Sequence, residues 1–144
     1  MKPLAVVRPE PGSTLVDLLR SRALEQPSRR VFTLLEDGET ETRHLDFAGL
    51  DRQARAIAAT LQRSAAAGER ALLLYPFGLD YAAAFFGALY AGMVAVPVYP
   101  PDPARLHRTL PRLRAIARDA QATRVLTTRA IRDLVGGLTH HALL

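Results

Sequence analysis

The stretch Gly92–Arg105, "GMVAVPVYPPDPAR", decides the fold. Its apolar run from Met93 to Val98 is typical of a strand with helices on both faces. Three prolines follow closely, and because proline has no amide hydrogen they cannot continue the hydrogen-bond ladder of a sheet. These prolines either simply stop the strand or also carry the backbone off its carboxyl end, where α/β proteins place their ligands. They are Pro100, Pro101 and Pro103.

The residues upstream predict a second strand and a helix between the two strands. Ala71–Leu74 is uniformly apolar and is followed by the turn sequence Tyr75–Gly78. A helix is expected from Asp80, as its cap, to Ala91, with Gly92 as its stop. Two apolar strands joined by one helix through short connections indicate a βαβ unit, hence parallel strands with a right-handed crossover.

The same pattern repeats downstream of the prolines. A helix is expected over Leu110–Asp119, capped by Thr109, with a proline tolerated in its first turn. Thr123–Thr128 reads as a third strand, and a last helix over Arg129–Leu134 is expected to end at a glycine pair. The tolerated proline is Pro111, and the glycine pair is Gly136-Gly137.

The amino-terminal half predicts two helices and a hairpin. One helix runs over Leu15–Gln26, capped by Ser13 or Thr14, and another over Phe47–Arg63, capped by Asp46. Between them, two extended runs are joined by Asp37-Gly38, which suits the positive φ angles of a tight turn. The predicted fold class is α/β: a three-stranded parallel sheet core built from βαβ units with flanking helices, plus an N-terminal helix and a peripheral β-hairpin.

Composition excludes several classes of protein. The 144 residues include no cysteine, so disulfide frameworks and thiolate metal sites are excluded. Of 19 basic residues only Lys2 is a lysine, and the arginines are scattered without interleaved aromatic residues, so nucleic-acid binding is not favoured despite a net charge of +5. The start of the chain is no secretory signal, and Gly92 and Pro97 interrupt the uncharged run Tyr81–Val98, so we expect no membrane span and a cytoplasmic protein.

A family resemblance is carried by two stretches of the chain. "ALLLYPFGLDYAAAFFGALYAGMVAVPVYPPDP", followed by "RLRAIARDAQATRVLTT", resembles the amino-terminal region of the adenylate-forming superfamily, which includes acyl-CoA synthetases and adenylation domains. The continuation "YPP", then "RL" and "DAQA", is similar to the fatty acyl-AMP ligases within it. "LVDLLRSRALEQPSRRVFTLL" and "LDFAGLDRQARAIAATLQ" match upstream, so the resemblance covers about Thr14 to Val135.

The resemblance implies a ligase that joins a fatty acid to ATP, giving an acyl-adenylate and pyrophosphate. The acyl group then passes to the pantetheine thiol of an acyl carrier protein, often at the head of a polyketide or peptide synthase, and the full-length enzyme needs ATP and Mg²⁺. The family's phosphate loop, metal-binding acid, ribose-binding Asp and late catalytic Lys match no residues here, so no catalytic, cofactor-binding or metal-binding residue carries over. Lys2 lies in the amino-terminal arm and is a poor candidate for a catalytic lysine.

Five residues remain as candidates for a functional site. Tyr75 and Tyr99 each follow a predicted parallel strand, where they either approach a bound substrate or carrier arm or simply pack. Arg105, Arg108 and Arg112 fall on one side of the segment after the prolines, as a docking face for an acidic carrier protein or as a solvated surface.

Other polar and aromatic residues favour structural roles. Phe85 and Phe86 read as core, with the wall of an acyl pocket as the alternative, and the remaining groups read as exposed or solvated rather than metal-binding. These are His44, His107, the adjacent His140-His141, and the acidic hairpin cluster Glu36, Asp37, Glu39 and Glu41.

The expected organisation is an extended arm over residues 1–13, the N-terminal lobe of an adenylate-forming enzyme over 14–135 and a tail over 136–144. Such a lobe is expected to be inactive alone, whether it is an excised piece, a truncated gene product or half of a split enzyme. Its partners would be the remainder of the ligase, a fatty acid and a carrier protein. An exposed sheet edge also makes self-association an expectation. The residues leave open a non-catalytic interaction module and a small basic RNA-binding α/β domain.

Overall fold

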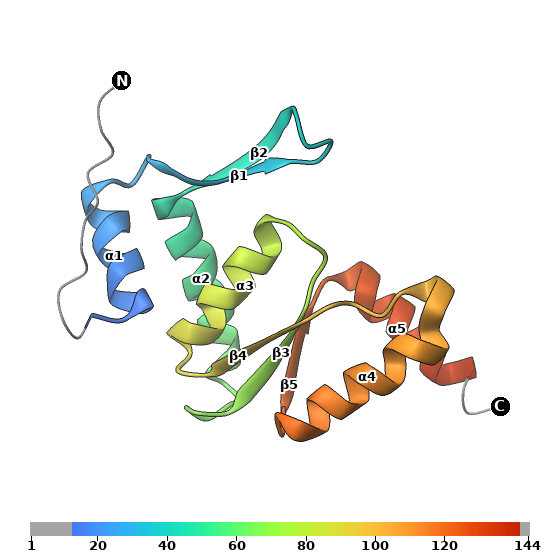
Figure 1. Ribbon diagram of the computed structural model, residues 1–144. Helices are drawn as coiled ribbons and strands as arrows, with labels where there is room; N and C mark the ends of the chain where they lie inside the picture. The colour runs from blue at the N-terminus through green and yellow to red at the C-terminus, as the bar shows by residue number, and fades with distance from the viewer. Residues whose placement is uncertain (1–12, 142–144) are drawn as a thin grey trace.

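The structure is a computed structural model that describes residues 13–141, without the side chains of several residues in the last two helices. Most of the predicted arm and the end of the predicted tail lie outside these residues. Two sheets are present: an antiparallel pair in the order β1-β2 and a parallel sheet in the order β4-β3-β5 (Figure 1). The α/β fold class is therefore confirmed, including the hairpin and the N-terminal helix. The elements in chain order are α1 Leu15–Glu25, β1 Arg30–Leu35, β2 Glu41–Asp46, α2 Phe47–Leu61, β3 Arg70–Leu74, α3 Leu79–Tyr90, β4 Val94–Val98, the 3₁₀ turn η1 Pro103–Arg105, α4 Leu106–Asp119, β5 Arg124–Thr127 and α5 Arg129–His141.

Side-chain caps begin the first two helices as the sequence predicts. Thr14 and Asp17 form a capping box at α1, in which the Asp17 amide donates to the Thr14 hydroxyl over 3.1 Å. The Asp46 carboxylate accepts from the Gly49 amide over 2.7 Å at the start of α2. At α3 the prediction is wrong, because Gly78 is the cap residue and Asp80 lies within the first turn without a capping hydrogen bond.

The parallel sheet is buried along its central strand. Residues 71–74 of β3 are all buried, whereas Val94 and Pro97 of β4 are exposed. The expectation that Val94–Val98 is covered on both faces is therefore wrong for the described residues, because β4 is an edge strand. Core side chains gather where α2 and α3 pack on each other and on β3. Leu50 and Leu73 are the largest of the fully buried side chains.

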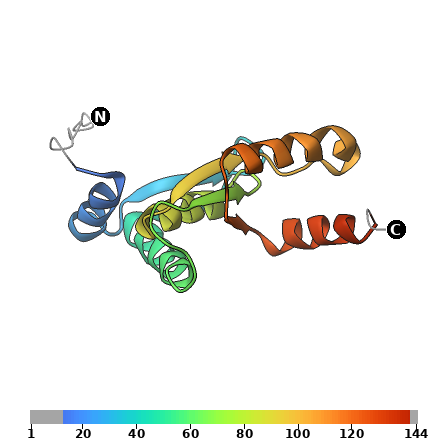
Figure 2. The same cartoon turned by 90° about the horizontal axis from the view of Figure 1, so that it is seen from below.

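The last two helices differ most from expectation. α4 begins at Leu106 after a 3₁₀ turn, so Pro111 lies inside the helix and Thr109 is not its cap. α5 continues through Gly136-Gly137 to His141 instead of ending there. In both views α4 and α5 project from the end of the molecule opposite α1 (Figures 1 and 2). Between residues 13 and 141 no helix combines the length and apolar character needed to cross a bilayer.

Candidate functional site

The candidate site lies at the carboxyl ends of β3 and β4. The two strands pair in parallel with Leu74 opposite Val98, so the residues that follow them, Tyr75 and Tyr99, leave the same edge of the sheet. Both tyrosines line one cavity of about 530 Å³. Its wall is aromatic, aliphatic and proline-rich, and consists of Tyr75, Pro76, Phe77, Tyr81, Pro97, Val98, Tyr99 and Pro100. Of the three prolines after β4, Pro100 therefore helps to form a cavity as well as to end the strand.

The two tyrosines occupy different environments. Tyr75 is half-buried, and burial followed by the nearby Asp80 carboxylate raises the pKa of its phenol. It therefore stays protonated at neutral pH, as a hydrogen-bond donor rather than a base. Tyr99 is 92% exposed.

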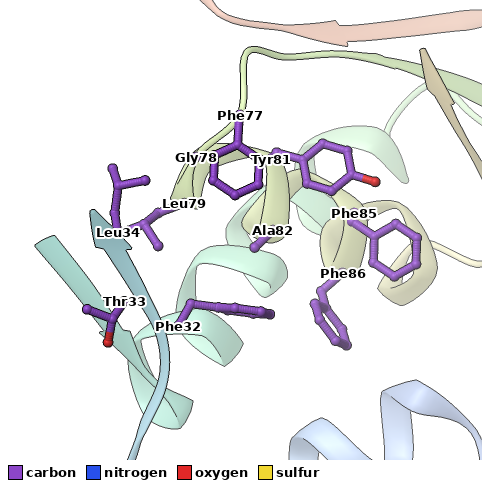
Figure 3. A pocket seen from close by; sticks show the side chains of 10 residues that line it. All are labelled: Phe32, Thr33, Leu34, Phe77, Gly78, Leu79, Tyr81, Ala82, Phe85 and Phe86. Carbon is purple, nitrogen blue, oxygen red and sulfur yellow. The ribbon is translucent and has the colours of Figure 1, made fainter. Parts of the chain in front are cut away.

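A second cavity of about 340 Å³ adjoins the first and shares Phe77 and Tyr81 with it. Figure 3 shows β1 on one side and the first turns of α3 on the other, with the Phe32 ring extending from β1 toward α3. Its lining is Phe32, Thr33, Leu34, Phe77, Gly78, Leu79, Tyr81, Ala82, Phe85 and Phe86. The two cavities give this edge of the lobe a nearly continuous apolar surface.

The aromatic rings of α3 contact one another along this surface. Tyr81 stacks on Phe85 with ring centroids 6.4 Å apart, and Phe85 meets Phe86 edge-on at 5.6 Å. Both phenylalanines are half-buried, and Phe86 also packs against the core. Phe86 therefore contributes to the core, as predicted, and both rings line a cavity, whose use as the wall of an acyl pocket stays a prediction.

A third cavity, of about 480 Å³, is more polar and lies where β3 and β5 end. It includes Tyr75, Asp80 and Arg129, together with two threonines that already have partners. The Thr127 hydroxyl donates to the Leu74 carbonyl over 2.7 Å, and the Thr128 hydroxyl accepts from the Ile131 amide over 3.3 Å. The carboxyl edge of the sheet can therefore hold an apolar chain beside a polar group.

The predicted arginines lie elsewhere. Arg105 ends the 3₁₀ turn, and Arg108 and Arg112 lie on α4, all three exposed. Residues three and four apart share a helix face, so the two on α4 point the same way. Arg105 is 4.0 Å from the Asp102 carboxylate. None of the three lines the cavities at the tyrosines.

The histidines and the hairpin acids have no common site. His44 and His107 are exposed, and the side chains of His140-His141 lie outside the description. The four hairpin acids are also exposed, and Asp37 caps the turn by accepting from the amides of Glu39 and Thr40. Over the described residues no group of three His, Cys, Asp or Glu side chains could hold a metal ion.

Sequence reasoning missed the most exposed aromatic residue of the site. Phe77 is 96% exposed and lines both apolar cavities. Its place in a turn between Pro76 and Gly78 was a usable signal, because a large apolar side chain in a turn has no strand or helix face to bury it. Phe32 gave no such signal, since its contact with α3 depends on how the hairpin packs.

Fold and cavities together define an open α/β lobe that presents ligand-sized apolar cavities at the carboxyl edge of a parallel sheet. The family model of the AMP-binding enzymes matches residues 19–142. The chain belongs to this family.

Similar proteins define the branch of the family. The medium-chain-fatty-acid–[acyl-carrier-protein] ligase JamA of Moorena producens is 56% identical over 115 residues, which are 80% of this chain and 19% of that protein. The crystal structure of a fatty acid AMP ligase from Legionella pneumophila is 40% identical with a TM-score of 0.72, over 80% of this chain and 19% of that one. Human disco-interacting protein 2 homolog A is 37% identical, over 84% of this chain and 8% of its own length. The chain is thus homologous to the amino-terminal region of fatty acyl-AMP ligases and spans about a fifth of their length.

Proposed function

We propose that residues 14–135 act as the amino-terminal lobe of a fatty acyl-AMP ligase. The complete enzyme would join a fatty acid carboxylate to the AMP moiety of ATP, release pyrophosphate, and pass the acyl group to the thiol of an acyl carrier protein. The observation that carries this proposal is the 56% identity to JamA over 80% of the chain, since JamA is named as a ligase of medium-chain fatty acids and carrier protein. We place the enzyme in the cytoplasm.

We propose that this lobe is inactive alone. The described residues offer no cluster of acidic groups for Mg²⁺, and the whole sequence holds one lysine and no glycine-rich phosphate loop. The residues present therefore do not fit ATP or Mg²⁺, and in our proposal both bind to other parts of the complete enzyme. The lobe supplies a scaffold and surfaces.

Two of its surfaces would serve the reaction. The cavity between Tyr75 and Tyr99 would lie beside the acyl chain or the pantetheine arm, which its apolar lining and two phenols suit. Arg105, Arg108 and Arg112 would attract an acidic carrier protein, since they are exposed cations on one segment.

The test is fatty-acid-dependent exchange of pyrophosphate into ATP. The purified chain is assayed alone and after mixing with the rest of JamA, produced as a separate polypeptide without its own matched segment. We expect no exchange from either polypeptide alone and exchange from the mixture with a medium-chain fatty acid. Turnover by the chain alone would refute its incompleteness, and a bound but inactive mixture would refute the proposed function.

A further inference from the structure

The outer edge of β5 is open along its length. β5 pairs with β3 on one side, and the described residues place no strand on the other. The Val94 amide donates to the Glu69 carbonyl over 2.9 Å, so residues 69, 71 and 73 face β4 and residues 70, 72 and 74 face β5. With Ala71 paired to Arg124 and Leu73 paired to Leu126, the amides of Arg124 and Leu126 point to β3, and those of Val125 and Thr127 face away from it. An edge of this kind is a template for another strand.

Val125 makes this edge apolar as well as unpaired. It pairs with Leu72 in the sheet, and its side chain is 56% exposed. Leu126 packs against the core on the opposite face. A β-branched side chain that remains exposed beside an open ladder marks a place where further apolar surface fits.

The helices on either side of β5 also have apolar sides without close packing. None of their described side chains is buried, and neither helix packs closely on the sheet. On α4 the half-buried apolar residues are spaced three or four apart, as on one side of a helix. They are Leu110, Leu113 and Ala117, and α5 has Ile131 and Leu134 at the same spacing. Figure 2 shows that α4 and α5 extend away from the rest of the molecule, beside β5, and are separated from each other. An amphipathic helix is stable when its apolar side rests on another layer.

The solved relative indicates what provides that layer. In the Legionella ligase the same fold, at a TM-score of 0.72, makes up 19% of a longer chain. The fold therefore occurs in that protein as one part of a longer chain.

We propose that the edge of β5, residues 124–127, is the seam at which a β-strand from the remainder of an adenylate-forming domain joins this sheet. The added strand takes up the outward amides and gives α4 and α5 a sheet surface for their apolar sides. The inference rests on the proposed function, since it names the partner of the lobe, and it assigns that partner to one edge of one strand.

Backbone hydrogen exchange tests the seam on the unsubstituted chain. Amide exchange is measured for the chain alone and with the rest of JamA in excess. We expect hydrogen exchange at the Val125 and Thr127 amides, which face away from β3, to slow about tenfold or more on binding, because each gains a partner. The buried α2 residue Ala54 serves as an internal reference and should not change. Binding without protection of β5 would overturn the proposal.

Matched substitutions test the same seam by affinity. Val125→Asp places a charge where the added strand packs, and we expect it to raise the Kd for the JamA polypeptide about tenfold or more. Leu24→Asp, at a leucine of α1 that is 82% exposed, is the control and should leave the Kd unchanged. Val94→Asp probes the open edge of β4, where the side chain is 49% exposed. Weaker binding of Val94→Asp with normal binding of Val125→Asp would move the seam to β4 and overturn the proposal.

The outcomes separate the seam from the function. Restored pyrophosphate exchange without protection of β5 leaves the function standing and removes the seam. Protection of the β5 amides without pyrophosphate exchange leaves the seam standing and removes the function. If circular dichroism shows that Val125→Asp is unfolded, the hydrogen-exchange data on the unsubstituted chain decide whether β5 is the seam.

Discussion

Gly87 of α3 packs directly against Ile57 of α2. A Cβ atom at this position would lie 2.5 Å from Ile57 Cγ2 and 2.7 Å from Ile57 Cβ. We therefore expect Gly87→Ala to lower the free energy of unfolding by about 1–3 kcal/mol, the usual cost of overpacking. Gly136→Ala is the matched control, because a Cβ there meets nothing within 4 Å and alanine favours a helix by about 1 kcal/mol. Urea unfolding measures both, and equal effects would show that the contact between helices is not tight.

Tyr90 joins three helices through its hydroxyl and its ring. The hydroxyl donates to Asp51 Oδ1 over 2.7 Å, and Arg20 lies over the ring at 5.2 Å. Burial and then the Asp51 carboxylate raise the pKa of this phenol, so it stays a donor. Tyr90→Phe should lower the free energy of unfolding by about 1 kcal/mol, since Asp51 keeps its ion pair with Arg55. Thermal unfolding measures this effect, and Tyr99→Phe, at an exposed ring, should leave the free energy of unfolding unchanged in the same experiment.

Asp37 gives the hairpin turn a dependence on pH. The backbone amides of Thr40 and Glu39 lower the pKa of its carboxyl from 3.8 to about 2. Because the folded pKa is below the unfolded one, its contribution is present above about pH 4 and is lost as the pH falls toward 2. An NMR titration of the Thr40 amide should have its midpoint near 2 and should lose this transition in Asp37→Asn. A midpoint near 3.8 would contradict the turn geometry.

At the scale of elements, α4 carries the proposed contact with a carrier protein. Arg108→Glu together with Arg112→Glu reverses two exposed charges on one face. In the complex with the JamA polypeptide, we expect the KM for carrier protein to rise about tenfold, because charge complementarity is lost. Pyrophosphate exchange should not change, since these side chains lie away from the cavities. Arg63→Glu, after α2, is the control for net charge, and an equal rise there would show that no specific face exists.

Most elements were predictable because their signals are local. Thr14 and Asp46 each begin a helix by capping it, and the apolar run of β3 stands between clear turn residues. The hairpin was also predicted, but its turn was not. Only Gly38 has a positive φ there, at 82°. The Gly38 amide closes a turn on the Leu35 carbonyl over 3.2 Å, and the Asp37 carboxylate accepts from the next two amides.

The helix α4 and its end at Asp119 were predicted correctly, but its predicted start was wrong because proline was taken as a sign of the first turn. The 3₁₀ turn over Pro103–Arg105 starts the helix earlier, so Pro111 lies inside it and cannot donate to the His107 carbonyl. Strand order was equally hidden, since apolar content alone does not distinguish the central β3 from the edge strand β4. The tyrosines of the site were predictable because each comes directly after a predicted strand. Phe32 did not, because only tertiary packing brings it to α3.

At the scale of the whole molecule, burial is uneven. The core clusters join α1, the hairpin, α2, α3 and β3, whereas α4 and α5 contribute no buried side chain among those described. Hydrogen exchange should therefore reveal two levels of stability, with slow amides in α2 and β3 and fast amides in α4 and α5. Uniform protection across the chain would show that the carboxyl-terminal part is packed as firmly as the rest.

The exposed apolar side chains also predict self-association of the isolated chain. Phe77 is 96% exposed and Tyr99 92% exposed on one cavity, and Val125 adds an apolar edge. Because large exposed apolar patches associate in water, we expect sedimentation velocity to show species heavier than 15.7 kDa that increase with concentration. Phe77→Ser with Tyr99→Ser should shift the distribution toward the monomer, whereas Leu24→Ser, at an isolated exposed leucine, should not. A single species of 15.7 kDa at all concentrations would show that these surfaces do not associate with themselves.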